Sequence, residues 1–381
     1  MRGLGLGLWG TALVVLGACG GSPASPTDGA VRDTDGAARD AGPTDSGPRD
    51  ATSPADRSVD VARLDVAVSD VALPDGLFLP DGPQADGPAI IPCDGGSACA
   101  WASWFASPCR LVADDTLLFV VDCSPWNIVR LPLAGGPKQE VALFQVFVRG
   151  MALDAHYLYW TADEDGLVVK YPLAGGSPVN VASGQDMPFG VASDGQTVYW
   201  TLGNSSLTSK VMSAPVAGGA PTELVSGGGG MFNDLATDGV WLFLSELGTA
   251  SVKKVPVSGG VPTLLATGPG EPSDLALDGT HVYWTTYGSQ GAVLRVPKDG
   301  GSAEVLASGQ DTPQDWVVDG GYVYFLTAPV TAAGAVNRVP IAGGPVEVVA
   351  PAAAPMGLAI SGAYLYYGEG TDGTIRRLPK P

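Results

Sequence analysis

The segment Thr280-His281-Val282-Tyr283-Trp284-Thr285 decides the fold of this chain, because it is one copy of a unit that the sequence contains seven times. Its tyrosine marks an aromatic position that recurs every 40 to 44 residues, at Phe119, Tyr159, Tyr199, Phe243, Tyr283, Tyr324 and Tyr366. A proline keeps the same spacing, at Pro132, Pro172, Pro215, Pro256, Pro297, Pro340 and Pro379. A period of this length, rich in β-branched and aromatic residues, predicts an all-β, seven-bladed β-propeller.

Each unit is predicted to form a blade of four antiparallel strands, as residues 188–228 illustrate. Asp194-Gly195 and Gly218-Gly219 are turn signals that separate short β-type segments. The second segment of each unit, such as Val198–Thr201, is apolar on both faces, as expected of a strand buried between two neighbouring blades. The recurring proline ends the third strand, where it needs to donate no backbone hydrogen bond.

The seventh unit ends with Thr374–Leu378 and lacks a fourth strand. Residues Ala98–Ser103 align with a fourth strand that has no first three strands of its own. The sequence therefore predicts that this N-terminal segment completes the seventh blade and removes an open sheet edge.

The cysteines fit an exported protein with disulfide bonds. Four of the five cysteines follow Cys19. The hairpin that turns near Asp115 places Cys109 opposite Cys123, so we expect a Cys109–Cys123 bond, and then a Cys93–Cys99 bond beside the closing strand. Metal binding by the four is the alternative, but no Cys-x-x-Cys spacing supports it.

Residues 1–18 have the form of a secretory signal peptide, with Arg2 followed by an apolar run from Leu4 to Leu16. The sequence Leu16-Gly17-Ala18-Cys19 resembles the bacterial lipobox, which implies cleavage before Cys19 and lipidation of that residue. The residue after Cys19 is Gly20 and not an aspartate, and by resemblance to the lipoprotein sorting rules of Gram-negative bacteria this favours the outer membrane. The expected location is therefore the outer membrane, on its periplasmic or its cell-surface side, with a stable acyl anchor.

Residues 19–92 are predicted to be a lipidated Cys19 and a disordered tether, and residues 93–381 the propeller. The segment 20–92 has 13 aspartates, five arginines and neither lysine nor glutamate. Its apolar content is too low to offset the entropy cost of ordering. A calcium-binding acidic repeat is the alternative, although no stretch matches the EF-hand spacing.

The segments His156–Thr161, Thr197–Thr201 and Thr280–Thr285 resemble the YWTD repeats of low-density lipoprotein receptor propellers, and they are also similar to repeats of myxobacterial secreted proteins. The resemblance covers residues 98–381 and implies a propeller. Two departures weaken any transfer of receptor function: the fourth aspartate of the motif is taken to be replaced or absent in every copy, and seven units replace six. Fold alone does not define function.

Two sets of acidic residues are candidate sites. The first is an acidic loop face for a basic partner, as an alternative to plain solvated surface. Its residues are Asp163, Glu164, Asp165, Glu246, Glu369 and Asp372.

The second set lies where the innermost strands begin. Gly150, Gly190 and Gly357 occupy this position in three units and Arg110 in another. The remaining three units have Asp234, Asp274 and Asp315 there, a candidate calcium site at the channel mouth. The alternative is hydrated carboxylates that cap strand ends.

The formal charge of −19 argues against nucleic acid as a partner. The sequence contains no motif that pairs a nucleophile with a base, such as Gly-x-Ser-x-Gly, so nothing in it points to an enzyme. The sequence thus favours a monomeric, lipid-anchored envelope module that binds an unidentified envelope protein or polysaccharide, with no cofactor expected beyond possible calcium. A calcium-dependent hydrolase or lyase is the alternative.

Overall fold

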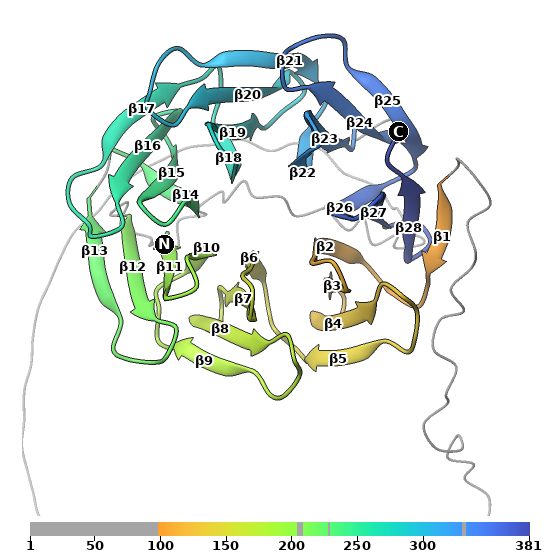
Figure 1. Ribbon diagram of the computed structural model, residues 1–381, viewed down its shortest axis with the longest axis horizontal. Helices are drawn as coiled ribbons and strands as arrows, with labels where there is room; N and C mark the ends of the chain where they lie inside the picture. The colour runs from red at the N-terminus through yellow and green to blue at the C-terminus, as the bar shows by residue number, and fades with distance from the viewer. Residues whose placement is uncertain (1–97, 204–208, 228, 330–332) are drawn as a thin grey trace, which may run out of the picture. The chain divides into compact units, whose positions relative to one another are not determined.

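The computed structural model describes residues 98–203, 209–227, 229–329 and 333–381. These residues form seven four-stranded antiparallel sheets, arranged as the blades of a ring (Figure 1). The predicted all-β, seven-bladed propeller is confirmed. Within the described ranges, no helix is long and apolar enough to cross a membrane.

In every blade the strands follow one another from the channel outward. The innermost strands are β2 (Pro108–Ala113), β6 (Val148–Leu153), β10 (Pro188–Ser193), β14 (Met231–Thr237), β18 (Pro272–Leu277), β22 (Pro313–Asp319) and β26 (Pro355–Ser361). The second strands are β3 (Leu117–Asp122), β7 (Tyr157–Ala162), β11 (Thr197–Leu202), β15 (Trp241–Leu247), β19 (His281–Thr286), β23 (Tyr322–Thr327) and β27 (Tyr364–Glu369).

The outer half of each blade has the same order. The third strands are β4 (Asn127–Pro132), β8 (Leu167–Pro172), β12 (Lys210–Pro215), β16 (Ser251–Pro256), β20 (Gly291–Pro297), β24 (Gly334–Pro340) and β28 (Thr374–Pro379). The fourth strands are β5 (Gln139–Ala142), β9 (Val179–Ala182), β13 (Thr222–Ser226), β17 (Thr263–Thr267), β21 (Glu304–Gln310), β25 (Glu347–Ala352) and β1 (Cys99–Ala102). All seven third strands end at the recurring proline, as predicted.

The hydrophobic core lies between blades. In β7, for example, Tyr159 and Trp160 are fully buried although their side chains point to opposite faces of the sheet. Tyr159 packs with Trp200 of the following blade, whereas Trp160 packs with Phe119 of the preceding blade. This confirms the prediction that the second strands are buried on both faces.

The threonine of the repeated motif connects neighbouring blades near the channel. The hydroxyl of Thr161 accepts a hydrogen bond from the amide of Gly150 at 2.8 Å and donates one to the carbonyl of Phe189 in the next blade. Thr201 repeats the arrangement with Gly190 at 3.0 Å and Asn233 at 3.1 Å. Buried polar groups require such partners, so the hydroxyl fixes the distance between adjacent inner strands.

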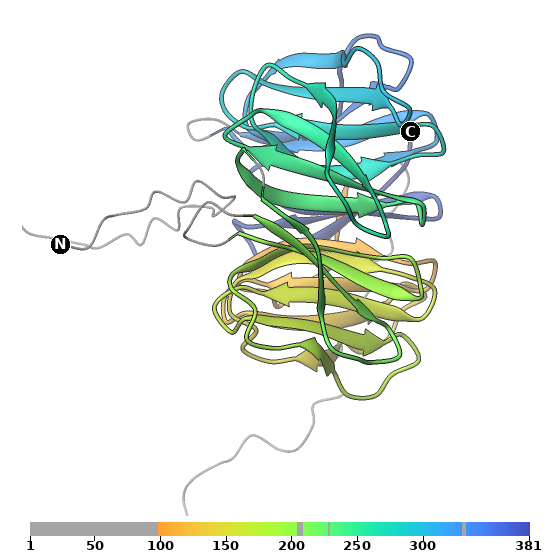
Figure 2. The same ribbon diagram turned by 90° about the vertical axis from the view of Figure 1, so that its left-hand side faces the viewer.

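The N-terminal strand closes the ring. β1 pairs antiparallel with β28, the last strand of the chain (Figure 1), and Figure 2 shows the ring of blades from its side. Trp101 of β1 is 1% exposed and lies edge-on to the ring of Tyr366 at 5.1 Å between centroids. The predicted closure of the seventh blade by this segment is thereby confirmed.

A disulfide joins Cys109 in β2 to Cys123 after β3, with their Cα atoms 5.8 Å apart. This confirms the predicted pair in the first blade. Cys99 is also disulfide-bonded. Its predicted partner Cys93 lies outside the described residues, as do Cys19, the signal peptide and the tether.

Two faces of the ring differ in their chemistry. The first-to-second and third-to-fourth strand turns form one face, which we call the turn face. Its Asp-Gly turns are structural: Asp154, for example, accepts hydrogen bonds from the Tyr159 hydroxyl at 2.7 Å and from the amides of His156 and Tyr157. The connections between blades and the second-to-third strand loops form the opposite face, which we call the link face.

Candidate functional site: the link face and the channel

The link face carries most of the backbone strain of the described part of the chain. Eight non-glycine residues of the described ranges have positive φ; seven lie in the loops and connections of this face, and the eighth, Asp315, lies in the innermost strand β22. They are Trp104, Trp126, Phe144, Phe147, Met187, Ala250, Thr312 and Asp315. Strained backbone of this kind clusters at functional sites, and it is unusual for large side chains.

Three of the six acids predicted to form a binding face are buried. Asp163, Glu246 and Glu369 are at most 9% exposed, so they cannot present their carboxylates to a partner. Asp163 forms a 2.9 Å ion pair with Arg149. For these three residues the prediction is wrong. They look like loop positions in the sequence, but they lie at or just after the ends of second strands, and their side chains point inward beneath the connections between blades.

Glu246 and Glu369 hold the connection that precedes the innermost strand of their own blade. Glu369 accepts hydrogen bonds from the amides of Ala353 at 3.1 Å and Ala354 at 2.6 Å. Glu246 accepts from the Gly230 amide at 3.3 Å and forms a 2.6 Å ion pair with Lys253. Both carboxylates therefore provide acceptors for backbone amides that no strand satisfies.

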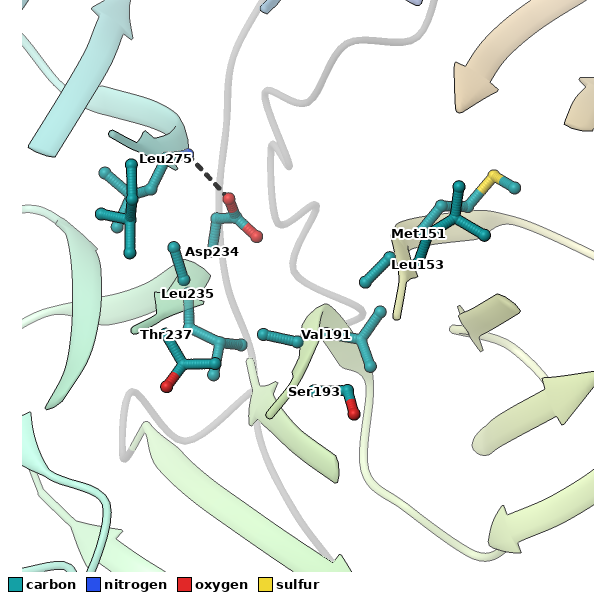
Figure 3. A pocket seen from close by; sticks show the side chains of 12 residues that line it. Met151, Leu153, Val191, Ser193, Asp234, Leu235, Thr237 and Leu275 are labelled. Carbon is teal, nitrogen blue, oxygen red and sulfur yellow. Dashed lines mark hydrogen bonds between the residues drawn. The ribbon is translucent and has the colours of Figure 1, made fainter. Parts of the chain in front are cut away.

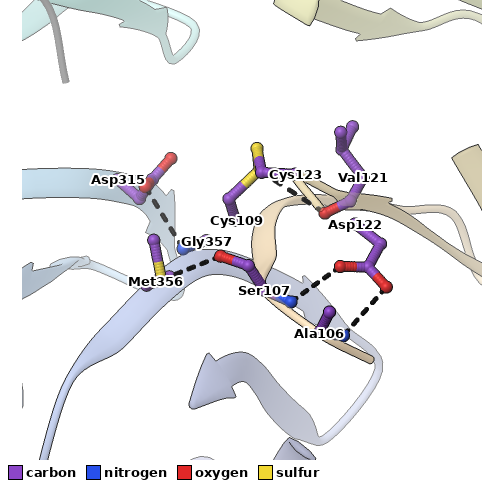
Figure 4. The surroundings of a disulfide bond; sticks show 9 residues. All are labelled: Ala106, Ser107, Cys109, Val121, Asp122, Cys123, Asp315, Met356 and Gly357. Atoms are coloured by element: carbon purple, nitrogen blue, oxygen red, sulfur yellow. Dashed lines mark hydrogen bonds between the residues drawn. A yellow bond between two sulfur atoms is a disulfide. The ribbon is translucent and has the colours of Figure 1, made fainter. Parts of the chain in front are cut away.

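The first blade uses an aspartate in the same way. Asp122 follows the anchor Phe119 by three residues, as Glu246 follows Phe243 and Glu369 follows Tyr366. Its carboxylate accepts from the amides of Ala106 at 3.0 Å and Ser107 at 2.7 Å (Figure 4). The fourth acid of the motif is therefore not replaced or absent in every copy, which corrects the sequence interpretation. Aligning these positions to the anchor would have found it.

The other three acids of the predicted face remain exposed. Glu164 and Asp165 lie in the loop between β7 and β8. Asp372 lies in the loop between β27 and β28, where Arg376 pairs with it at 2.7 Å. Of the six predicted acids, the two that are exposed and form no ion pair, Glu164 and Asp165, thus both lie in the second blade.

The three predicted channel aspartates lie on adjacent innermost strands. Asp234 of β14 points into a hollow of about 270 Å³ that the innermost strands of four blades line (Figure 3). Its Oδ2 accepts a hydrogen bond from the amide of Leu275 in the next blade at 2.7 Å. Asp315 does the same with Gly357 at 3.2 Å. These two carboxylates therefore bond to amides inside the next innermost strand, in β18 and β26, and link adjacent blades, whereas the structural alternative places them at strand ends.

The channel aspartates also influence one another electrostatically. Burial, and then the neighbouring Asp274 carboxylate, raise the pKa of Asp234 to about 7. Burial raises the pKa of Asp315 to about 6, although the Arg110 guanidinium opposes the shift. Among the described residues, however, no three His, Cys, Asp or Glu side chains are grouped so as to hold a metal ion. The calcium site stays a prediction that this arrangement does not support.

We expect the channel to make stability depend on pH. The folded-state pKa of Asp234 lies above its ordinary value, so the folded state loses stability as pH rises from about 4 to about 7. An Asp234→Asn variant keeps the acceptor for Leu275 and should exceed the wild type by about 2 kcal/mol at pH 8 after allowance for partial exposure. The two proteins should not differ at pH 4. Urea unfolding at both pH values measures this.

Asp278 on the turn face provides a control of opposite sign. Burial raises its pKa, but hydrogen bonds from Tyr283, Thr280 and His281 outweigh burial and lower it to about 2. An Asp278→Asn variant should therefore lose about 1 kcal/mol at pH 8, after allowance for solvent screening, and the loss should shrink as pH falls below about 4. Equal pH slopes for the two variants would contradict the assignment.

The sequence prediction missed the exposed aromatic side chains. In the described ranges, those of Trp104, Phe144 and Tyr287 are 74%, 67% and 51% exposed, and all three lie on the link face. Trp126 and Phe147 belong to the same face, and their ring centroids are 5.0 Å apart. Aromatic residues in loops, outside the repeated anchors, are the sequence signal that would have indicated them.

Comparisons with known proteins agree on the fold. No family model and no curated protein sequence matches the chain. Similar solved structures include a catalytically inactive virginiamycin B lyase from Staphylococcus aureus with quinupristin, at TM-score 0.60 and 13% identity, covering 75% of this chain and 99% of that chain. U3-55K matches at TM-score 0.59 and 12% identity, over 75% and 99% of the two chains. A nidogen/laminin complex matches at 22% identity and TM-score 0.45, over 50% and 76%. At these identities the first two likenesses show the propeller fold alone.

Proposed function

We propose that this chain is a lipid-anchored binding module of a bacterial envelope, and that it binds its partner with the link face of the propeller. The observation that carries the proposal is the exposure of large aromatic side chains on that face, two of which, Trp104 and Phe144, stand on backbone of positive φ that favours glycine. Trp, Tyr, Phe and Met are enriched in protein interfaces. A protein partner fits this face best, and a polysaccharide is the alternative.

The anchor would be Cys19, and the segment 20–92 would act as a tether that lets the propeller reach its partner. The lipobox-like sequence before Cys19 supports this part of the proposal. If lipidation holds the protein at the outer membrane, a Cys19→Ser variant should leave the membrane fraction after fractionation of the producing cells. A variant that remains there would refute the anchor.

The binding face is tested by capture from solubilised envelope extract. The variant Trp104→Ala/Phe144→Ala/Tyr287→Ala should lose a partner that the wild type retains. A matched control removes exposed aliphatic side chains elsewhere, as Val240→Ala/Val261→Ala/Leu264→Ala. The control should retain the partner.

Protease treatment of the extract distinguishes a protein partner from a polysaccharide, because only the former is destroyed. Equal capture by the link-face variant and the wild type would overturn the proposed binding face. A calcium-dependent hydrolase or lyase remains the second candidate of the sequence, and no contact in the channel favours it.

A further inference from the structure

A second hollow lies on the link face between the second and third blades, with a volume of about 550 Å³. It is lined by Phe147, Arg149, Asp163, Glu164, Gln185, Asp186 and Met187, and we call it the blade-2 hollow. Pockets of this size accommodate several side chains of a ligand. The lining contains two of the six acids that the sequence assigned to a binding face, Asp163 and Glu164, together with apolar side chains.

The floor of the hollow is electrically neutral. The guanidinium of Arg149 pairs with Asp163 and lies 5.4 Å from the ring centroids of both Phe147 and Phe189. The Gln185 amide is also engaged, because its Oε1 accepts from the Trp200 indole at 3.0 Å and its Nε2 donates to the Ser183 carbonyl at 3.1 Å. An anionic ligand would therefore have to displace Asp163 from Arg149.

The rim of the hollow is negative. Glu164 and Asp186 are exposed, and neither forms an ion pair with a described residue. The lining thus has three carboxylates and one guanidinium, a net charge of −2. A neutral apolar occupant would desolvate the rim carboxylates without compensation, whereas a cation would pair with them.

The apolar part of the lining stands on strained backbone. Phe147 and Met187 have φ of 52° and 51°, a backbone conformation that glycine adopts at lower energetic cost. Met187 is also 37% exposed. Contact with a ligand would explain why these positions have large side chains and not glycine. The methylene stems of lysine and arginine are apolar enough to make that contact.

We propose that the blade-2 hollow binds lysine or arginine side chains of a basic peptide segment in the partner protein. The stem would lie against Phe147 and Met187, and the cationic head would pair with Glu164 and Asp186. The inference rests on the proposed function, since it names the chemistry of the partner of the link face.

The direct test uses the full chain and a labelled ten-residue peptide of alternating lysine and alanine, with fluorescence anisotropy at 0.15 M salt. The variant Glu164→Gln/Asp186→Asn should weaken binding at least fivefold. The control Asp115→Asn/Asp299→Asn removes the same charge from exposed positions of the turn face and should change the Kd less than twofold. The same peptide with acetylated lysines should bind neither protein.

A third variant separates binding from structure. Met187→Gly relieves the positive φ, so it should weaken peptide binding without lowering the Tm. A purely structural role for the side chain predicts no change in affinity.

The outcomes separate this inference from the proposed function. Equal losses in the two charge variants would show attraction by net charge alone, and absence of peptide binding to the wild type would also overturn the inference. If the Glu164→Gln/Asp186→Asn chain still captures the envelope partner and the triple aromatic variant does not, the result supports the link face as the binding face and refutes binding at the blade-2 hollow. Capture that survives in both variants overturns both.

Discussion

A Glu246→Ala variant is expected to lose about 3 to 5 kcal/mol of unfolding free energy, because it leaves the Lys253 ammonium in a largely buried position without its partner. The Glu246 side chain is 0% exposed and its Oε2 lies 2.6 Å from the Lys253 Nζ. It also accepts hydrogen bonds from the Ser251 hydroxyl at 3.1 Å and the Gly230 amide at 3.3 Å. Urea unfolding followed by tryptophan fluorescence measures the loss.

The exposed Glu164 provides the control. Although the sequence assigns both acids to one face, Glu164→Ala should change stability by no more than about 0.5 kcal/mol. A second variant tests the cause: Glu246→Leu/Lys253→Met removes both charges and should recover much of the loss. If Glu246→Ala proves as stable as Glu164→Ala, the Glu246 carboxylate does not form a stabilising buried ion pair with Lys253.

The repeat made the architecture predictable in detail. The aromatic anchors gave the blade register, and the register showed that the seventh unit lacks a fourth strand while Ala98–Ser103 has no unit of its own. The pairing of β1 with β28 follows from that count. The Cys109–Cys123 bond was predictable for the same reason, because register and hairpin geometry place the two residues opposite each other.

The position of the acids was not predictable by the same reasoning. A glutamate at the end of a strand has the same local sequence whether it faces solvent or bonds to the connection below it. Burial of Glu369 depends on the course of Ala353–Ala354, which the repeat does not specify. The positive φ of Phe144 and Trp104 is equally invisible, because it is imposed by the connections and not by a glycine.

A glycine near the start of three innermost strands, at Gly150, Gly190 and Gly357, lets each of these strands approach the innermost strand of the next blade closely. A Cβ atom on Gly190 would lie 2.7 Å from the Cα of Asp234 and 2.4 Å from its Oδ1. We therefore expect Gly190→Ala to destabilise the propeller by about 3 kcal/mol or more, since backbone of the next blade must move. Thermal and urea unfolding of the variant measure the effect.

Gly279 is the matched control, because a Cβ there would meet no atom within 4 Å and its backbone is not in the left-handed region. Gly279→Ala should therefore change stability by less than about 1 kcal/mol, in either direction. The contrast between the two substitutions reports the contact between the third and fourth blades. A Gly190→Ala variant as stable as Gly279→Ala would mean that the ring can widen at low cost. In that case the hydroxyl bridge from Thr201 to Asn233 would not set the spacing of the inner strands.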